Sequence, residues 1–222
     1  MKFDLHCHSF YSKDALSSPK KLLKAAKERG LDGIAITDHD TVAGWEEAKK
    51  SAKELGLFLI LGEEIKTKRN GKIVGDVLGL FLEKEIKSRD ILTVIKEIKS
   101  QGGIVIVPHP FFFPENFKDN LEKYINLIDG IEVLNARCPF QRANKKAQEF
   151  AKKHNLAQIG SSDAHWAGNV GDAFTIAEAK NLEEFKRKIL EKKITFGGKR
   201  SPLWTLILPS LARIRNIFSP PF

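Results

Sequence analysis

Short apolar runs alternate with amphipathic stretches along most of this 222-residue chain. This alternation constrains the fold more than any other feature, because strands that alternate with helices form a mostly parallel sheet. About seven strands in one unbroken chain favour an α/β barrel over an open sheet. The predicted strands are residues 2–5, 33–37, 58–65, 74–81, 104–107, 130–134 and 157–160.

The segments between these strands carry helix and turn signals. Ser17-Ser18-Pro19 is typical of a helix start, with proline in the first turn. Residues 91–98 and 182–189 repeat apolar side chains at the spacing of one helix face. In the region 56–81, two strand-like runs instead flank Asn70-Gly71, which is a strong hairpin signal.

Composition narrows the possible functions. Cys7 and Cys138 lie far apart, which favours a reducing, cytoplasmic setting over a disulfide framework. The first ten residues have no signal-peptide pattern, and no apolar run approaches the roughly 18 residues of a membrane helix. The net charge of +9 favours an anionic substrate. Because its lysines are scattered along helices, this charge does not by itself indicate nucleic-acid binding.

Histidines concentrate where predicted strands end. The carboxyl ends of barrel strands meet at one mouth, so side chains placed there are expected to converge. His6 and His8 are two residues apart on a strand and therefore point to the same face, whereas Cys7 points away. Imidazoles with nearby carboxylates suit divalent ions such as zinc, iron or manganese. Five of the six histidines occupy such positions, namely His6, His8, His39, His109 and His165.

Four short motifs resemble those of the PHP (polymerase and histidinol phosphatase) superfamily. They are Asp-Leu-His-Cys-His-Ser at 4–9, Thr-Asp-His-Asp at 37–40, Pro-His-Pro at 108–110 and Ser-Ser-Asp-Ala-His at 161–165. They follow the family order. The resemblance implies a distorted TIM-like barrel of seven β/α units, the PHP fold. It also implies two or three divalent ions (Mn²⁺, Zn²⁺, Fe²⁺ or Mg²⁺) that cleave phosphate esters.

The resemblance also implies a set of metal ligands, of which Glu64, His109, Asp163 and His165 are the candidate catalytic residues. The three implied metal positions are His6, His8, Glu64 and Asp163; then Asp14, His39 and His165; and then Asp76 and His109, bridged by Glu64.

The chain departs from the family pattern in two places. Lys13 stands where the family often has an acidic residue, so the loop must bulge by one residue for Asp14 to serve. Asp76 stands where members often have histidine, which makes the third position more anionic. Between Glu63 and Glu64 only one can point inward, and the family pattern selects Glu64.

Candidate substrate contacts follow two other strands. Asn135 and Arg137 follow the strand 130–134, and arginine can grip a phosphate with two donors. Arg137 is equally consistent with a loop salt bridge. Arg200 follows Gly197-Gly198, a flexible stretch that could reach the mouth. Three aromatics at 111–113 are expected either to stack a base or to cover the core.

The predicted function is metal-dependent hydrolysis of a small phosphorylated metabolite or nucleotide, because the closest resemblance is to nucleoside 3′,5′-bisphosphate phosphatases. Three alternatives stay open: a 5′-3′ exonuclease on short RNA or DNA, a histidinol-phosphate phosphatase, and a non-catalytic metal-binding module. A continuous positive groove beside the mouth would favour the exonuclease.

The predicted catalytic domain spans 1–200, and residues 201–222 form an amphipathic extension. Its apolar residues recur at helical spacing, with a helix starting near Pro209. We expect it to pack on the barrel or to join a second subunit in an oligomer, with binding to a membrane surface as an alternative. These apolar residues are Trp204, Ile207, Leu211, Ile214 and Phe218.

Overall fold

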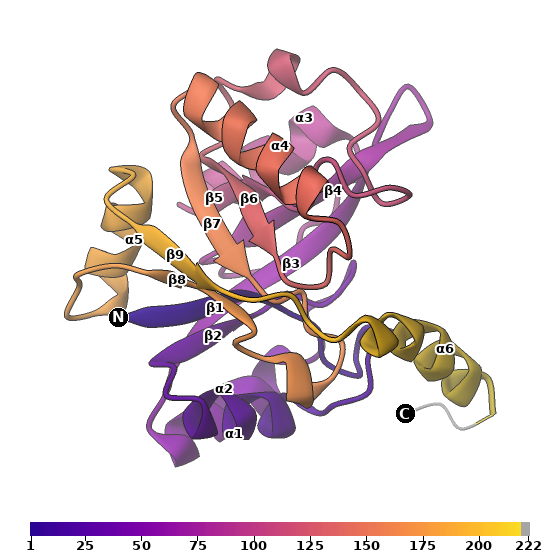
Figure 1. Ribbon diagram of the computed structural model, residues 1–222, viewed down its shortest axis with the longest axis vertical. Coiled ribbons are helices and arrows are strands. Elements are labelled where there is room, and N and C mark those ends of the chain that lie inside the picture. The colour runs from indigo at the N-terminus through magenta and orange to yellow at the C-terminus, as the bar shows by residue number, and fades with distance from the viewer. Residues whose placement is uncertain (219–222) are drawn as a thin grey trace.

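The structure is a computed structural model that describes residues 1–218, with side chains described through residue 215. Its nine strands form one sheet in the order β7-β6-β5-β4-β3-β2-β1-β8-β9, curled into a nearly closed barrel (Figure 1). The strands are β1 Lys2–Cys7, β2 Gly33–Ile36, β3 Phe58–Arg69, β4 Lys72–Leu80, β5 Ile104–Val107, β6 Gly130–Asn135, β7 Ala157–Ser161, β8 Ala173–Ile176 and β9 Thr195–Gly198. The helices are α1 Pro19–Glu28, α2 Trp45–Leu55, α3 Ile91–Ser100, α4 Gln141–Lys153, α5 Leu182–Leu190 and α6 Leu208–Phe218, with 3₁₀ turns η1 Leu121–Tyr124, η2 Ala167–Asn169 and η3 Leu203–Ile207.

The distorted barrel predicted from the sequence is confirmed, and all seven predicted strands are present. Strand β3 is longer than expected and turns into β4 through Asn70 and Gly71, whose φ angles of 50° and 76° suit the predicted hairpin turn. Two further strands, β8 and β9, lie beyond β1 in the sheet. Strand β9 was missed because it ends in two glycines, which disfavour strands, and no sequence signal marked the four residues of β8.

Apolar side chains fill the end of the barrel opposite the histidines. Phe3, Leu5 and Ile60 belong to this interior cluster, and α5 contributes Phe185 and Ile189. The rings of Phe3 and Phe185 lie 4.5 Å apart, centroid to centroid. Fully burying each such side chain contributes roughly 1.5–3 kcal/mol. Because apolar side chains fill its base, the barrel is a packed core, and its polar site lies at the mouth.

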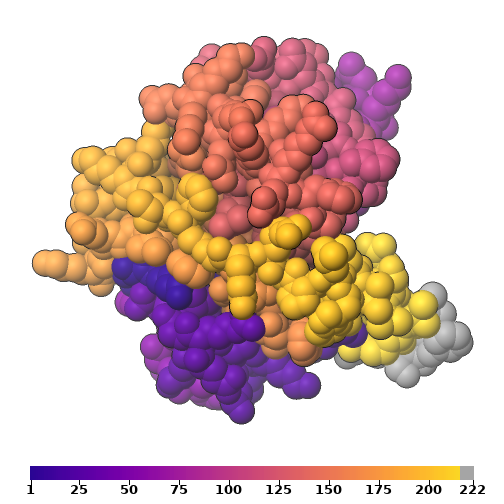
Figure 2. Space-filling view, viewed as in Figure 1, coloured from indigo at the N-terminus to yellow at the C-terminus, as the bar shows by residue number. Residues whose placement is uncertain are grey.

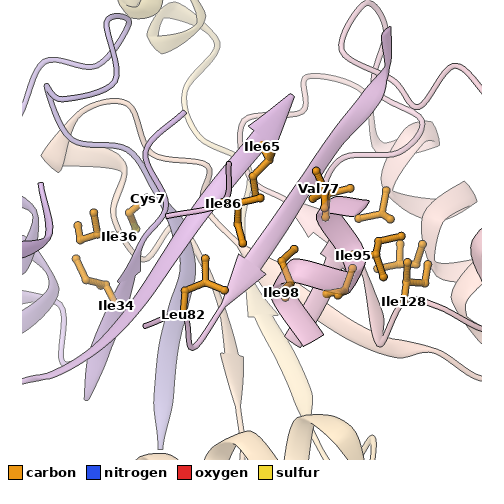
Figure 3. Packing of buried hydrophobic residues seen from close by; sticks show 14 of the residues in the cluster. Cys7, Ile34, Ile36, Ile65, Val77, Leu82, Ile86, Ile95, Ile98 and Ile128 are labelled. Carbon is orange, nitrogen blue, oxygen red and sulfur yellow. The ribbon is translucent and has the colours of Figure 1, made fainter. Parts of the chain in front are cut away.

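A second apolar layer lies between the outer face of the sheet and the helices (Figure 3). Helices α1 and α2 cover the side of β2 and β3, and α3 and α4 cover the side of β5 and β6 (Figure 1). Polar side chains cap the first turns of two of these helices. Ser18 caps α1 ahead of Pro19, and Asp90 caps α3 by accepting from the Thr93 N–H at 3.0 Å. Cys7, Ile34 and Ile36 belong to this outer layer.

A bulge in β1 decides which of its side chains face the mouth. Asp4 pairs with Ile34 and Cys7 pairs with Ile36, so three steps along β1 match two along β2. Strict alternation would place Cys7 inside with Leu5. The extra residue reverses the alternation, so Cys7 packs outside and His6 points inward.

The C-terminal segment forms η3 and α6. Helix α6 begins at Leu208, one residue before the predicted start, with Pro209 in its first turn. Thr205, Pro209 and Ala212 are buried, but the apolar side chains of Trp204, Ile207, Leu211 and Ile214 are exposed, and α6 projects from the barrel (Figure 2). The boundary at residue 200 and a role in oligomers therefore stay predictions. The side chain of Phe218 and residues 219–222 lie outside the described residues. Within residues 1–218, no helix is long and apolar enough to cross a membrane.

Asp4 ties β1 to the segment that carries Asp163. Its carboxylate accepts the N–H of Ser162 at 2.9 Å, the Ser162 hydroxyl, and the N–H of Gly171 at 2.7 Å, and burial raises the Asp4 pKa to about 6. Asp4→Ala would leave these buried donors unpaired, at about 1–3 kcal/mol each. We expect urea denaturation to show a loss of about 3 kcal/mol or more in the free energy of unfolding. The control is Asp32→Ala, which removes one exposed bond, and an equal loss in both variants would contradict this role.

Candidate metal centre

Four predicted ligands converge at the mouth of the barrel. His6 and His8 Nε2 each lie 3.3 Å from Glu64 Oε2, and they lie 3.6 and 3.4 Å from Asp163 Oδ1. The two Nε2 atoms are 2.9 Å apart. Four ligands about 2.1 Å from one ion in a tetrahedron lie about 3.4 Å from one another. The spacing of these donor atoms therefore fits a single divalent ion.

Unsatisfied buried atoms at this place are a second test of the fit. Glu64 Oε2, Asp14 Oδ1, Asp76 Oδ1 and His109 Nδ1 are buried and have no hydrogen-bond partner. Leaving several buried polar atoms unpaired is costly, and a buried carboxylate usually coordinates a metal or pairs with a charge. Imidazole and carboxylate ligands together suit Mn²⁺, Zn²⁺ or Fe²⁺. The residues present thus fit the divalent ions that the sequence led us to expect.

The structure places the second predicted group beside the first. His8, His39 and His165 offer nitrogen atoms within 4.8 Å of one another. Asp14 Oδ2 lies 3.7 Å from His39 Nε2, and Asp14 Oδ1 lies 3.8 Å from His165 Nε2. Asp14 is buried while Lys13 is exposed, as the bulged loop requires.

The third predicted group is less compact. His109 Nε2 lies 3.1 Å from Glu64 Oε1, and His6, Glu64 and His109 can together reach one ion. Asp76 lines the same cavity, and its pKa is raised to about 6 by burial and by the charge of Glu64. Because β4 runs antiparallel to β3, its amino-terminal half, which carries Asp76, lies at the mouth.

The two neighbouring glutamates point in opposite directions. Ile60 lies in the barrel interior, and Glu64 is four residues further along the same strand face. Glu63 instead faces outward and accepts the backbone N–H of Ile86 at 2.9 Å. Only Glu64 reaches the histidines.

Two buried carboxylates orient the imidazoles of His6 and His8 through their Nδ1 atoms, one directly and one through a serine hydroxyl. Glu132 accepts from His6 Nδ1 at 3.1 Å and from the His109 backbone N–H at 2.8 Å, which leaves His6 Nε2 facing the centre. Asp38 accepts from the Ser12 hydroxyl at 3.0 Å, and that hydroxyl lies 3.3 Å from His8 Nδ1. Glu132 was not among the predicted site residues, although a carboxylate inside an apolar strand was a usable signal.

Backbone strain also marks the site. Asp40, His109 and Asp163 have φ angles of 53°, 30° and 54°, in the left-handed region that side chains with a Cβ rarely adopt. Such strain clusters at functional sites, where the surrounding contacts enforce it. For His109 the enforcing contact is the bond from its N–H to Glu132.

The buried charges shift one another's pKa values. Burial lowers the pKa of His8 and His109, but bonds to carboxylates outweigh it, and both pKa values rise to about 9. Burial raises the pKa of Asp163, but Arg137 and His6 hold it well below its usual value. Burial, followed by the charge of His8, lowers the pKa of His165 to about 3, so that this imidazole is neutral.

A cavity of about 640 Å³ opens over these ligands, and its wall carries the basic residues Lys13, Lys66, Arg137 and Arg213. Arg137 Nε lies 3.3 Å from Asp163 Oδ2, and its guanidinium also forms a two-pronged pair with Glu115. The loop salt bridge expected as one alternative therefore exists, and it fixes Arg137 at the cavity wall.

The other predicted substrate contacts lie elsewhere. Asn135 is buried and donates to Glu132 and to Asp163 Oδ2, the latter at 3.1 Å, so it supports the ligands. Arg200 does not line this cavity but belongs to a second one. Phe112 is buried, whereas Phe113 is exposed outside the cavity.

Two residues that the sequence did not indicate complete the mouth. Glu115 offers an oxygen within 4.8 Å of ligand atoms of His109 and Asp163. Arg213 of α6 donates to Asp14 Oδ2 at 2.8 Å. The sequence did not indicate this contact, because Arg213 belongs to none of the four motifs and its position depends on where α6 lies.

Comparison with known proteins identifies relatives along most of the chain. The PHP domain family matches residues 4–201. An uncharacterised protein of Methanocaldococcus jannaschii is 38% identical over 148 residues, which cover 61% of this chain and 82% of that protein. A 5′-3′ exoribonuclease of Haemophilus influenzae is 45% identical over 180 residues, covering 80% of this chain and 60% of the relative.

A solved structure shows the same fold. It is a two-domain protein of Bacteroides vulgatus containing a predicted PHP-like metal-dependent phosphoesterase. The TM-score is 0.76 at 23% identity, over 90% of this chain and 65% of that one. At this level of identity the likeness concerns the fold alone.

The opposite orientations of Glu63 and Glu64 yield a paired test. We expect Glu64→Gln to weaken Mn²⁺ binding by more than about 10-fold, because it removes a charged oxygen from the centre. Glu63→Gln makes the same chemical change one residue away and should bind Mn²⁺ like the wild type. Isothermal titration calorimetry measures both, and weaker binding by the Glu63 variant alone would contradict the assignment.

Proton release provides a test that depends on pH. At a pH of about 7.5, below the pKa of about 9 of His8 and His109, both metal-free imidazoles are protonated. A metal must displace these protons, so Mn²⁺ affinity should rise as the pH increases from about 7 to about 9. Titrations in two buffers of different ionisation enthalpy should show net proton release at the lower end of this range. Affinity that falls over the range would refute the expectation.

Proposed function

The chain belongs to the PHP domain family, and on this premise we propose that it is a metal-dependent hydrolase of phosphate esters. The main support for the proposal is the cluster of possible metal ligands at the barrel mouth, in which several groups share His6, Glu64 or Asp163. A cluster of this kind, in a cavity whose wall also carries Lys66 and Arg137, suits a substrate that brings anionic oxygens to cations.

When bound, divalent ions would supply a nucleophilic water of lowered pKa and positive charge for the phosphoryl oxygens. Water would attack phosphorus, and the alcohol would leave with a proton. In this proposal the ions are held by His6, His8, Glu64 and Asp163, by Asp14, His39 and His165, and by Asp76, His109 and Glu64.

The chain's own residues would prepare the phosphate. Arg137 is held between Glu115 and Asp163, and a fixed guanidinium matches the oxygen atoms of a phosphate. Lys66 adds charge on the same wall. His165 is neutral because burial and the charge of His8 lower its pKa, so its ring nitrogen keeps a lone pair for a cation. Asp163 stays ionised and keeps its negative charge at the centre.

The proposed substrate is a small phosphorylated metabolite or nucleotide. A second candidate, exonuclease activity on short RNA or DNA, is favoured by the similarity to the Haemophilus influenzae exoribonuclease. One metal centre could serve both, because each reaction breaks a phosphate ester. Neither histidinol-phosphate hydrolysis nor a purely binding role has a specific observation in its favour.

Activity assays with two histidine variants test the proposal. We expect Mn²⁺-stimulated hydrolysis of a phosphomonoester such as p-nitrophenyl phosphate, abolished by EDTA. His109→Ala should lower kcat/KM by about 100-fold or more, since it removes charge stabilisation from the phosphoryl site. His154→Ala is the control, because His154 packs against Phe150 and pairs with Glu122 away from the mouth. A protein that binds Mn²⁺ stoichiometrically but cleaves no phosphate ester would overturn the proposal.

A further inference from the structure

Large apolar side chains are exposed along η3 and the first turns of α6. Five such residues fall between positions 203 and 214, whereas others lie on separate elements, such as Ile73 on β4 and Leu190 at the end of α5. A sixth, Trp166, packs against this stretch, with its ring centroid 5.6 Å from that of Trp204. We call the six side chains the apolar face. They are Trp166, Leu203, Trp204, Ile207, Leu211 and Ile214.

The way α6 is seated turns this face outward. Pro209 and Ala212 lie three residues apart on one side of the helix and are buried. Leu211 and Ile214, also three residues apart, lie on the other side and are 48% and 53% exposed. Helix α6 projects from the barrel, and nothing among residues 1–215 covers the exposed half of these side chains (Figures 1 and 2). Apolar surface gathered in this way marks a contact with another molecule.

The charge around the apolar face is positive. Between residues 192 and 222 the sequence has no aspartate or glutamate. The basic residues of the same stretch are Lys192, Lys193, Lys199, Arg200, Arg213 and Arg215. Of these, Lys199 and Arg200 are exposed directly ahead of η3.

The other flank of the face is also basic. Lys21 and Lys24 of α1 line a hollow together with Trp166. Glu28 is the one acidic residue among the described residues of that lining, and its Oε1 atom lies 3.9 Å from Lys24 Nζ. Lys21 forms no ion pair with a carboxylate among residues 1–215. Exposed apolar side chains thus lie between two groups of basic ones.

This combination selects among the possible partners. A second copy of the chain, whose net charge is +9, would bring like charges together around the paired faces, which is unfavourable. A nucleic acid matches the charge, but Leu211 and Ile214 have no ring on which a base could stack. A bilayer with acidic headgroups satisfies both features, because it takes up apolar side chains and attracts lysine and arginine. Tryptophan, present twice in the face, favours the boundary between headgroups and acyl chains.

We propose that η3 and α6 attach the protein to the surface of an anionic lipid bilayer. The apolar face enters the boundary between headgroups and acyl chains, and the basic flanks lie at the lipid phosphates. The segment lies along the surface, since no helix within residues 1–218 is long and apolar enough to cross a membrane. This attachment does not depend on the proposed phosphoesterase function, because it concerns where the protein binds and not what it cleaves.

Co-sedimentation of the full chain with lipid vesicles tests the attachment. We expect the partition coefficient to be at least about 10-fold higher on phosphatidylcholine vesicles with about 30% phosphatidylglycerol than on phosphatidylcholine alone, because several basic residues reach the surface. Leu211→Gln combined with Ile214→Gln should lower binding to the anionic vesicles by about 10-fold or more, since it removes apolar area but no charge.

The matched control is Ile73→Gln combined with Leu190→Gln. It makes the same two substitutions at side chains that are each 46% exposed on other elements. This variant should bind the vesicles like the wild type. All four positions are exposed, so both double variants should keep the wild-type thermal unfolding midpoint. If the two double variants bind equally, net charge alone draws the protein to the vesicles and the proposal is wrong.

Tryptophan fluorescence locates the contact. Lipids brominated along their acyl chains quench only those rings that enter the bilayer. Trp45 is 5% exposed in α2 and should contribute no quenching, so Trp166 and Trp204 are the expected sources. Trp204→Phe should therefore reduce the quenching by about 2-fold and keep the affinity, since phenylalanine preserves the apolar contact. Quenching that is unchanged in this variant would place another part of the surface on the bilayer and overturn the proposal.

Sedimentation velocity without lipid separates this partner from a second copy of the chain. We expect the wild type and the Leu211→Gln, Ile214→Gln variant to have the same mass in solution. A wild-type dimer that only this variant converts to a monomer would assign the apolar face to a second copy, and the lipid proposal would then fall.

Discussion

Buried charge at one end of the barrel is the constraint on which the rest of this structure depends. Ionised groups are expensive to remove from water, and here a carboxylate cluster and five imidazoles are gathered within a few ångströms. Pairing compensates part of the cost: Glu64 lies among His6, His39 and His109. Glu64 Oε2, Asp14 Oδ1 and Asp76 Oδ1 stay unpaired on residues that line the mouth, where cations would complete them.

Local irregularities in the sheet turn the polar side chains of this cluster toward the mouth. Bulges in β1 and β6 shift the alternation of side chains by one residue. In β1 the shift turns His6 inward, and in β6 it puts Asn135 rather than Leu134 on the side of Glu132. Regular strands would have placed apolar side chains at these positions. The apolar base formed with α5 supplies the rigidity that lets such irregular strands persist.

Basic side chains lie outside the metal centre in two places, at the wall of the mouth and in the second cavity. Arg137 is fixed at the wall of the mouth by Glu115 and Asp163. Beyond the loop 136–140, a second cavity is lined by Arg142, Lys145, Lys199 and Arg200, which form no ion pair with a carboxylate among residues 1–215.

The sequence by itself determined the barrel, its mouth and most of the candidate ligands. Alternating strands and helices predicted the architecture, and the ends of the strands predicted where His6, His39 and His165 lie. Alternation along β3 established that only one of Glu63 and Glu64 can face the centre, and the family pattern selected Glu64, which shares a face with Ile60.

Tertiary structure decided the rest, because it depends on contacts between residues far apart in the chain. Strand β8 pairs with the edge of β1, and β9 pairs with β8, so both depend on a sheet that the rest of the chain builds. Arg213 reaches Asp14 only through the path of α6. Arg200, expected near the mouth, is instead held by the carbonyl of Pro139 in the wall of another cavity. Local sequence sets strand period and helix faces, whereas such long-range positions follow from how the whole sheet closes.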